Sequence, residues 1–387
     1  MTERRAIVVG AGIGGLAAAI GLHRAGWAVR VLERAPALTE VGAGIALWSN
    51  ALRALESLGV AAEIRAYGTL QSEGGVRTPD GRWLSRSSGP ELRDELGVSL
   101  LMVHRATLHR ALREALPAGV VEVGATVVGL RGDAVAYRRG GAGRYAEGDV
   151  VVGADGVRST VRAALYPGAM WTRYAGFTAW RGVTDQPYPL HRQSQTWGDG
   201  AEFGLVQLLD GRVYWFATGD EAEGTRFPDE RAEVLRRFGG WHPPIAQVVR
   251  ATDADAVLRH DIHVLPRPLP PFAAGRVALL GDAAHAVTPN LGQGGALALE
   301  DAVVLAHELA GPGSVTDALQ RYDTARRPRA EQVSRASEQA GRLIGLRNPL
   351  LVRLRTALRR PCRRASRWRG SPGPWPGGRR RDGGCGG

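Results

Sequence analysis

Short apolar runs, each followed by a turn, recur along this chain and alternate with stretches of helical spacing. Arg5–Val9 predicts a buried strand, and Leu16 to Ala25 has the apolar spacing of a helix. Further apolar runs at Val29–Leu32, Asp149–Gly153 and Arg276–Leu280 also predict buried strands. Strands that alternate with helices are typical of an α/β fold around a largely parallel sheet.

The middle of the chain follows a different pattern. Residues from Trp171 to Thr218 are rich in aromatic and β-branched side chains and predict an antiparallel sheet, which Ala256–Val264 extends. The remaining predicted elements are helices at Ser49–Leu58, Arg105–Leu116, Phe227–Val249, Leu297–Leu309 and Ser314 to about Leu346, and a hairpin within Val120–Glu147.

These elements predict a discontinuous arrangement. We expect a Rossmann-like domain, with C-terminal helices, from residues 1–70, 101–170 and 266–346. We expect an inserted antiparallel β-sheet domain from residues 71–100 and 171–265. Residues 347–387 are expected to hold the end of a helix and a disordered tail.

The first turn carries a dinucleotide fingerprint in its full context. Gly10-Ala-Gly-Ile-Gly-Gly15 joins a predicted strand to a predicted helix, and Glu33 ends the next strand. Such glycines let a pyrophosphate approach the helix N-terminus, and the acid binds ribose hydroxyls. The candidate residues are Gly10, Gly12, Gly14, Gly15 and Glu33. Arg34 is a candidate contact for adenine or phosphate, although a surface role explains it nearly as well.

A second glycine-rich turn follows the strand at 276–280. Asp282 stands at the end of that strand, where it could accept hydrogen bonds from ribityl or ribose hydroxyls. The free amides of the helix that follows attract an anion or an electron-rich ring edge. The candidate contacts here are Gly292, Gln293, Gly294, Gly295 and Ala296. A third acid–glycine turn, Asp155-Gly156, is expected to support the cofactor loops.

Charge and cysteine content narrow the function classes. The net charge is +12, but residues 347–387 hold 12 arginines and one acid, so the body is nearly neutral. We therefore expect no nucleic-acid partner. The only cysteines are Cys362 and Cys385, and the histidines lack metal-site spacing, so we expect no metal. No apolar stretch is long enough to cross a membrane, and a cytoplasmic protein fits.

The three turns together resemble the single-component FAD-dependent aromatic hydroxylases, flavoprotein monooxygenases built like para-hydroxybenzoate hydroxylase. The resemblance covers Met1 to about Gly345. Tyr174-Ala-Gly-Phe-Thr-Ala-Trp-Arg-Gly-Val183 and Gly211-Arg-Val-Tyr-Trp-Phe216 are similar to the salicylate, hydroxynicotinate and urate hydroxylase branch.

The resemblance implies further site residues. Arg105 stands where the family places an arginine against the FAD pyrophosphate, and Gly44, Ala46, Val127 and Asp155 are also implied as cofactor contacts. Three residues are implied on the reacting side: Pro289, Tyr214 and Glu202. Other candidates for the substrate pocket are Trp48, Trp180, Gln195, Phe203 and Trp215. Because Tyr214 and Trp215 are neighbours in a predicted strand, only one of these two can face the pocket. His104 and His285 are expected to be structural.

Glu202 departs from the family pattern. The urate-type enzymes place an arginine where this chain has Glu202, and an acid there would repel an anionic purine. The resemblance implies non-covalent FAD, NADH or NADPH as a transient reductant, and O₂. It also implies a flavin hydroperoxide that hydroxylates a small aromatic, heteroaromatic or polycyclic substrate. The alternatives are a flavin epoxidase, oxidase or reductase on the same fold and, distantly, an interaction protein with a basic tail. A monomer and a homodimer are both compatible.

The C-terminal segment is unlike the rest. From Arg359 the chain is rich in Arg, Pro, Gly and Ser, with too few apolar side chains to offset the entropy of ordering it. The whole chain contains arginine and no lysine. A shifted reading frame in a GC-rich gene would encode such an end, and a genuine flexible basic tail is the equal alternative.

Overall fold

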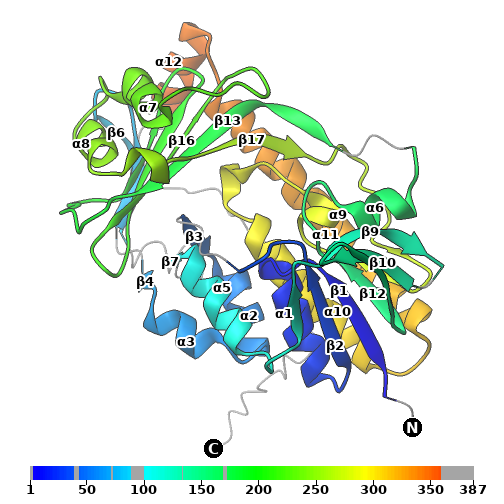
Figure 1. Cartoon of the computed structure of the whole chain (residues 1–387). Coiled ribbons are helices and arrows are strands. Elements are labelled where there is room, and N and C mark those ends of the chain that lie inside the picture. The colour runs from blue at the N-terminus through cyan, green and yellow to red at the C-terminus, as the bar shows by residue number, and fades with distance from the viewer. Residues whose placement is uncertain are drawn as a thin grey trace, which may run out of the picture.

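The computed structural model describes residues 3–38, 43–70, 73–88, 100–132, 134–168 and 172–358. Two sheets dominate it, and the predicted α/β class is confirmed (Figure 1). The basic tail beyond Leu358, for which we expected disorder, lies outside the described residues.

The first sheet is the Rossmann-like one. It has six strands in the order β18-β19-β12-β1-β2-β8. Their bounds are Ala273–Ala274 (β18), Val277–Leu279 (β19), Val150–Gly153 (β12), Arg5–Val9 (β1), Ala28–Glu33 (β2) and Val121–Val123 (β8). All neighbours pair in parallel except β18 and β19. The central strands β1, β12 and β19 are short, mostly apolar and buried because layers cover both faces of the sheet.

Helices and a hairpin form those layers. Helix α1 packs against α10, and α10 packs against α2 and α11. The helices on this side are α1 (Ile13–Arg24), α2 (Ser49–Ser57), α3 (Ala61–Ala66), α5 (Arg105–Glu114), α6 (Thr160–Leu165), α9 (Asp282–His285), α10 (Gly294–Ala310) and α11 (Val315–Ile344). The last helix, α12 (Pro349–Leu358), lies at the opposite end of the molecule (Figure 1). Strands β9 (Thr126–Arg131), β10 (Ala134–Arg139) and β11 (Ala142–Glu147) form a separate antiparallel sheet, and β3 (Gly44–Leu47), β7 (Leu101–His104) and β4 (Thr69–Leu70) form another.

The second large sheet has seven strands in the order β17-β13-β16-β15-β14-β5-β6. Their bounds are Leu258–Val264 (β17), Arg173–Val183 (β13), Val213–Gly219 (β16), Glu202–Gln207 (β15), Ser194–Trp197 (β14), Glu73–Arg77 (β5) and Trp83–Ser88 (β6). Helices α7 (Glu230–Phe238) and α8 (Ile245–Arg250) cover one face of this sheet (Figure 1). Only β14 and β5 pair in parallel among its described neighbours.

The prediction of one helix over Phe227–Val249 was wrong. The structure has two helices, and the chain between them contains Pro243 and Pro244. Proline has no backbone N–H and clashes with the preceding helical turn, so a helix cannot run through this pair.

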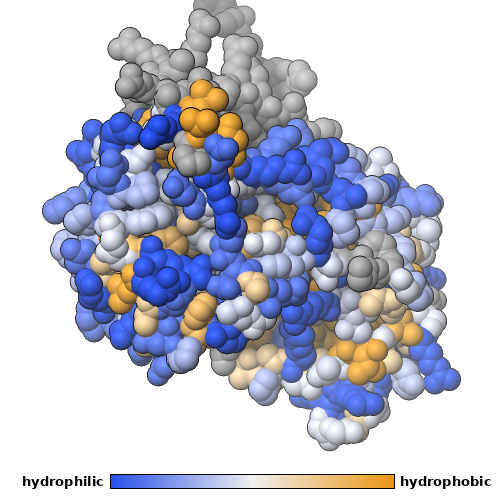
Figure 2. Space-filling view, turned by 90° about the horizontal axis from the view of Figure 1, so that it is seen from above, coloured by the Kyte–Doolittle hydropathy of each residue, from blue (hydrophilic) through white to orange (hydrophobic). Residues whose placement is uncertain are grey.

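No helix among the described residues is long and apolar enough to cross a membrane. A small apolar patch is nevertheless exposed on α12, where Leu350, Leu351 and Leu354 are 72%, 46% and 53% exposed. Figure 2 shows it beside the grey atoms.

Candidate active site

The first glycine turn is shaped for close packing on one side and for a ligand on the other. Gly10 has a φ of +100°, and a Cβ on it would lie 2.5 Å from the carbonyl oxygen of Ala154. A Cβ on Gly15 would lie 1.9 Å from the Gly10 oxygen. A Cβ on Gly12 would meet nothing within 4 Å. Gly12 therefore borders open space at the N-terminus of α1, where the pyrophosphate is expected.

Free amides complete this turn. The first internal bond of α1 joins the Leu16 N–H to the Gly12 carbonyl at 2.9 Å, so the amides of residues 13–15 have no partner inside the helix. Gly14 serves the packing of α1 instead, because a Cβ on it would lie 2.7 Å from Leu280 and 3.1 Å from Ala298.

Glu33 stands at the carboxyl end of β2, half-buried. Its Oε2 accepts a hydrogen bond from the Ala11 amide at 2.7 Å, and Oε1 accepts one from the Ala35 amide at 2.8 Å. Each carboxylate oxygen keeps a lone pair for a ribose hydroxyl. Arg34 is exposed, and its side chain has no partner in the described part of the chain.

Arg105 and Asp282 bring opposite charges to the same region. Desolvation lowers the pKa of Arg105, and the carboxylate of Asp282 opposes that effect. Asp282 is exposed at the end of β19, and neither side chain has a hydrogen-bond partner among the described residues. Arg105 can pair with a phosphate while Asp282 accepts from a hydroxyl, so these residues fit a flavin dinucleotide.

The second glycine turn leads into α10. Residues Pro289–Leu291 form one helical turn, and Gly292 follows with a φ of +61°, which favours glycine. The Leu297 N–H bonds to the Gln293 carbonyl at 2.9 Å, which leaves the amides of residues 294–296 at the open end of the helix. The site of a Cβ on Gly292 lies 3.5 Å from the Trp48 indole nitrogen and 3.8 Å from Ala46.

A buried ionic network supports this turn from behind. Asp301 on α10 accepts from the Gly281 amide at 3.0 Å, from Nε2 of His285 at 2.5 Å and from Nε of Arg326 at 2.7 Å. His285 and Asp301 are both 0% exposed. His285 is thus committed to an ion pair, in keeping with the expectation that it is structural.

The protonation states in this network are set by the neighbours. Burial alone would raise the pKa of Asp301, but His285 and Arg326 hold it at about 2. Burial would lower the pKa of His285, and Asp301 reverses this and raises it. Asp301 is therefore ionised at neutral pH, and its carboxylate favours the protonated form of His285.

The network also reaches α2. The neighbouring carboxylate on α10, Glu300, pairs with Arg326 at 2.7 Å and accepts from Nδ2 of Asn50 at 2.6 Å. Asn50 donates as well to Oε1 of Gln293 at 3.0 Å, which holds the residue before α10. Sequence reasoning missed Asn50, Glu300, Asp301 and Arg326, although two adjacent acids in the apolar middle of α10 were a usable signal.

Asp155 organises its own turn, as the sequence predicted. Its Oδ1 accepts from the Ser159 hydroxyl at 2.5 Å, and Oδ2 accepts from the Thr160 amide at 2.7 Å, so both oxygens cap α6. Arg162, which the sequence analysis missed, is 3% exposed and donates to the Ala283 carbonyl at 2.8 Å. It joins α6 to the loop that carries Asp282.

Two other predicted residues have structural contacts. Nδ1 of His104 accepts from the Ala106 amide at 3.3 Å and caps α5. Val127 on β9 is half-buried against the core of the Rossmann-like side, and its contact with the cofactor stays a prediction.

Tyr214 lies on the seven-stranded sheet, on the face opposite α7 and α8. We call this the Tyr214 face; it carries Glu202, Gly204 and Val206 from β15 and Tyr214, Phe216 and Thr218 from β16, which pair across the two strands. Gln195 pairs with Gly204 and lies on the same face.

Trp180, Phe203 and Trp215 lie on the other face. They are buried in a core with α7 and α8, and the rings of Phe203 and Trp215 stack at 5.6 Å. The prediction that Trp180 and Phe203 line the substrate pocket was therefore wrong. Pairing with the neighbouring strands puts both side chains on the face of the sheet that the helices cover. The prediction that only one of Tyr214 and Trp215 faces the pocket agrees with this register.

The Tyr214 face packs against β3, the strand that leads to the Gly292 turn. A Cβ on Gly44 would lie 2.4 Å from Cδ1 of Tyr214, so this glycine makes room for the tyrosine ring. Tyr214 is 7% exposed among apolar side chains that include Ala43 and Met102. Because β3 carries both Gly44 and Ala46, the same strand borders Tyr214 at one end and the Gly292 turn at the other, and Trp48 follows directly after it.

Two residues missed by sequence reasoning, Arg181 and His260, also lie here. Arg181 hydrogen-bonds Tyr214, and its Nη1 is 3.4 Å from Nδ1 of His260. Desolvation lowers the pKa of His260, and Arg181 and Arg105 lower it further. Arg105 from the cofactor side therefore lies near the edge of the Tyr214 face.

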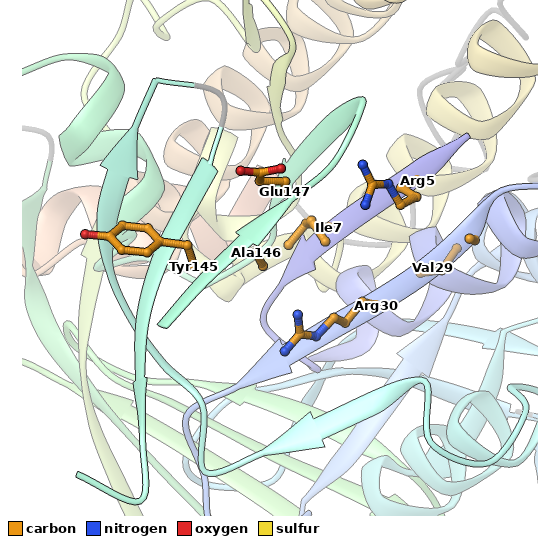
Figure 3. Close-up of a pocket in the computed structure, with 8 residues that line it drawn as sticks. Arg5, Ile7, Val29, Arg30, Tyr145, Ala146 and Glu147 are labelled. Carbon is orange, nitrogen blue, oxygen red and sulfur yellow. The ribbon is translucent and has the colours of Figure 1, made fainter. Parts of the chain in front are cut away.

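A cavity of about 430 Å³ lies elsewhere, between the amino-terminal parts of β1 and β2 and the end of β11. Figure 3 shows Arg5, Arg30 and Glu147 around it. Ligands of open α/β sheets bind at the carboxyl ends of the strands, so we do not assign this cavity to the cofactor. Among the described residues, no group of three His, Cys, Asp or Glu side chains could hold a metal ion.

This geometry defines a Rossmann-like dinucleotide-binding protein in which the two glycine-rich turns lie on the side of the antiparallel sheet. The sequence matches the family model described as FAD binding domain over residues 3–337, and the chain belongs to that family. Aurachin C monooxygenase/isomerase of Stigmatella aurantiaca is 41% identical over 358 residues, 92% of this chain and 93% of the relative.

Two further similarities agree. The 3-amino-4-hydroxybenzoate 2-monooxygenase of Streptomyces cremeus is 38% identical, covering 87% of this chain and 86% of the relative. The crystal structure of Klebsiella pneumoniae HpxO complexed with FAD and uric acid has a TM-score of 0.83 at 29% identity, and covers 92% of each chain. The protein is an FAD-dependent monooxygenase with the fold of the aromatic hydroxylases.

Proposed function

We propose that this enzyme consumes NADH or NADPH and O₂ and hydroxylates a small aromatic, heteroaromatic or polycyclic secondary-metabolite substrate. The observation that carries the proposal is the contact between Tyr214 and Gly44, because it sets the Tyr214 face against the strand that leads to the Gly292 turn. FAD, when bound, supplies hydride acceptance and oxygen activation. The protein must then bind the ring, orient it and exclude water.

Tyr214 is placed to orient the ring. Burial raises its pKa, and the charge and hydrogen bond of Arg181 only oppose that rise, so its phenol is protonated at neutral pH. The phenol oxygen accepts from Arg181, which leaves its O–H to donate to a substrate oxygen. The apolar side chains around it, among them Met102, Val183 and Leu208, keep water away.

The cofactor contacts are proposed residue by residue. We assign Gly10, Gly12, Gly14, Gly15 and the α1 amides to the pyrophosphate turn, Glu33 to the ribose and Arg105 to a phosphate. Asp282 would accept from a hydroxyl, and the residues that open α10 would lie against the flavin ring. Asp155 would act through α6, since its oxygens accept from Ser159, Thr160 and Val161 at the start of that helix.

Oxygen uptake tests the function. The purified yellow protein should oxidise NADH or NADPH faster when an aromatic substrate from a panel of phenols, heteroaromatic acids and quinolones is present. It should consume O₂ in proportion and give a product heavier by one oxygen atom. Substrate-driven O₂ consumption without a nicotinamide would indicate an oxidase instead. Nicotinamide oxidation that leaves O₂ untouched would indicate a reductase.

A further inference from the structure

Glu202 is an acid buried on the Tyr214 face. It is 3% exposed, opens β15 and pairs with Trp197 on β14 and Thr218 on β16. Alternation along β15 puts Phe203 in the core under α7 and α8, so the carboxyl group of Glu202 lies on the opposite face, which it shares with Tyr214.

Glu202 and Tyr214 lie at opposite ends of the Tyr214 face. Tyr214 pairs with Val206, four residues along β15 from Glu202, which corresponds to about 13 Å of strand. Between them lie Gly204 and Phe216, so close that a Cβ on Gly204 would be 2.1 Å from the Phe216 ring. The Tyr214 face is thus flat and apolar in the middle and polar at both ends. Its length suits a substrate of one or two fused rings.

The Glu202 end has no ion pair. No cation pairs with its carboxyl in the part of the chain that the structure describes. Burial raises its pKa to about 7, and a hydrogen bond from Trp197 only opposes the rise. The arginine over the Trp197 ring, Arg355, is 5.8 Å from the ring centroid and donates to the Ile344 and Gly198 carbonyls.

A ring carboxylate at this end would meet an acid in a dry site. Burial of an unpaired charge is costly, and a second negative charge beside it adds to the cost. The other cation of the Tyr214 face, Arg181, lies two strands away from β15, about 10 Å across the sheet, and is bonded to Tyr214. It cannot neutralise a charge beside Glu202.

We infer that Glu202 determines the substrate class: the ring end against β15 carries an uncharged hydrogen-bonding group, such as a ring N–H or carbonyl, and not a carboxylate. This inference rests on the function proposed above. It goes further because it names the side of the ring that must be uncharged and the residue that requires it.

Matched probes test it by binding alone. The dissociation constants of 4-hydroxyquinoline and 4-hydroxyquinoline-2-carboxylate, and of phenol and 4-hydroxybenzoate, are measured from the flavin absorbance change at neutral pH. The wild type should bind the neutral member of each pair roughly tenfold tighter or more. Glu202→Gln should reduce the ratio of the two dissociation constants by about threefold or more, and Glu202→Arg should reverse the preference.

Glu147→Gln is the matched control, because Glu147 is an exposed acid at the end of β11; it should leave the preference unchanged. If Glu202→Arg does not fold, the nearly isosteric Glu202→Gln carries the test. Equal or tighter binding of the carboxylates by the wild type, binding of neither member, or an unchanged preference in the Gln variant overturns the inference. Because the assay needs no turnover, a failure here is distinct from a failure of NAD(P)H-dependent oxygen uptake.

Discussion

At the scale of single residues, glycines in one turn have unequal tasks. Gly10, Gly14 and Gly15 lack a Cβ because the protein itself fills that space, whereas Gly12 faces open space. The sequence motif predicted all four as cofactor residues and could not separate them. The distinction depends on Ala154, Leu280 and Ala298, which come from segments distant in the sequence.

Gly12→Val should give folded protein that purifies with little or no flavin. The added side chain meets no protein atom within 4 Å at its Cβ, so the fold tolerates it, but it blocks the pyrophosphate. Gly143→Val on the exposed hairpin strand β11 is the control, since its Cβ is equally unobstructed. Flavin content from the visible spectrum and far-UV circular dichroism measure the two effects. A yellow Gly12→Val protein with full occupancy contradicts the assignment of this turn.

Glu202 should make stability depend on pH. Its folded pKa, about 7, lies above the ordinary 4.5, so the folded state holds its proton over this range and the unfolded state loses it. The contribution is therefore fully present below 4.5 and is lost as the pH rises through about 7. The loss amounts to about 3 kcal/mol of unfolding free energy. Urea titrations should show this slope in the wild type but not in Glu202→Gln, and parallel curves would contradict it.

At the scale of elements, local patterns predicted type and order well. Strands β1, β2, β12 and β19 and the long helices were recognisable from apolar spacing and glycines. The hairpin predicted within Val120–Glu147 was only partly right, because β8 joins the Rossmann-like sheet while β9, β10 and β11 form a sheet of their own. Which face of β15 and β16 meets α7 and α8 was not, because Trp180 and Phe203 are equally suited to a core or a pocket. The ionic network was also missed, since its partners lie on α2, α10 and α11 and meet only after the helices pack.

The buried and the exposed ion pairs between α11 and α10 should differ in strength. Arg326 pairs with Glu300 and Asp301, all 6% exposed or less, while Arg321 pairs with Glu308 at the surface. Arg326→Met leaves Asp301 with His285 alone and Glu300 with the more distant Arg329, and should cost about 3–5 kcal/mol of unfolding free energy. Arg321→Met should cost less than about 1 kcal/mol. Urea titration of both variants measures the loss of unfolding free energy. Equal losses would show that the buried network does not hold α11 to α10.

At the scale of the whole molecule, one helix connects the two large sheets. Helix α11 packs against α10 and β18 on the Rossmann-like side, and beyond its end the Leu346 carbonyl accepts from the Gly200 amide at 3.1 Å. Arg355 on α12 is 4% exposed and donates to the Gly198 carbonyl at 3.2 Å. The site between the sheets thus depends on a C-terminal clamp that no sequence motif marks. The division into two discontinuous domains stays a proposal.

Truncation separates this clamp from the basic tail. Removal of residues 359–387 should leave flavin content and NAD(P)H oxidation within about twofold, because that segment has too few apolar side chains to add stability. Removal of residues 346–387 also deletes α12, takes Arg355 away from Gly198 and bares the Trp197 side of the sheet. The melting temperature should then fall by at least about 3 °C. Loss of flavin or activity in the shorter truncation would mean that the tail contributes to fold or function, and an unchanged melting temperature in the longer one would refute the clamp.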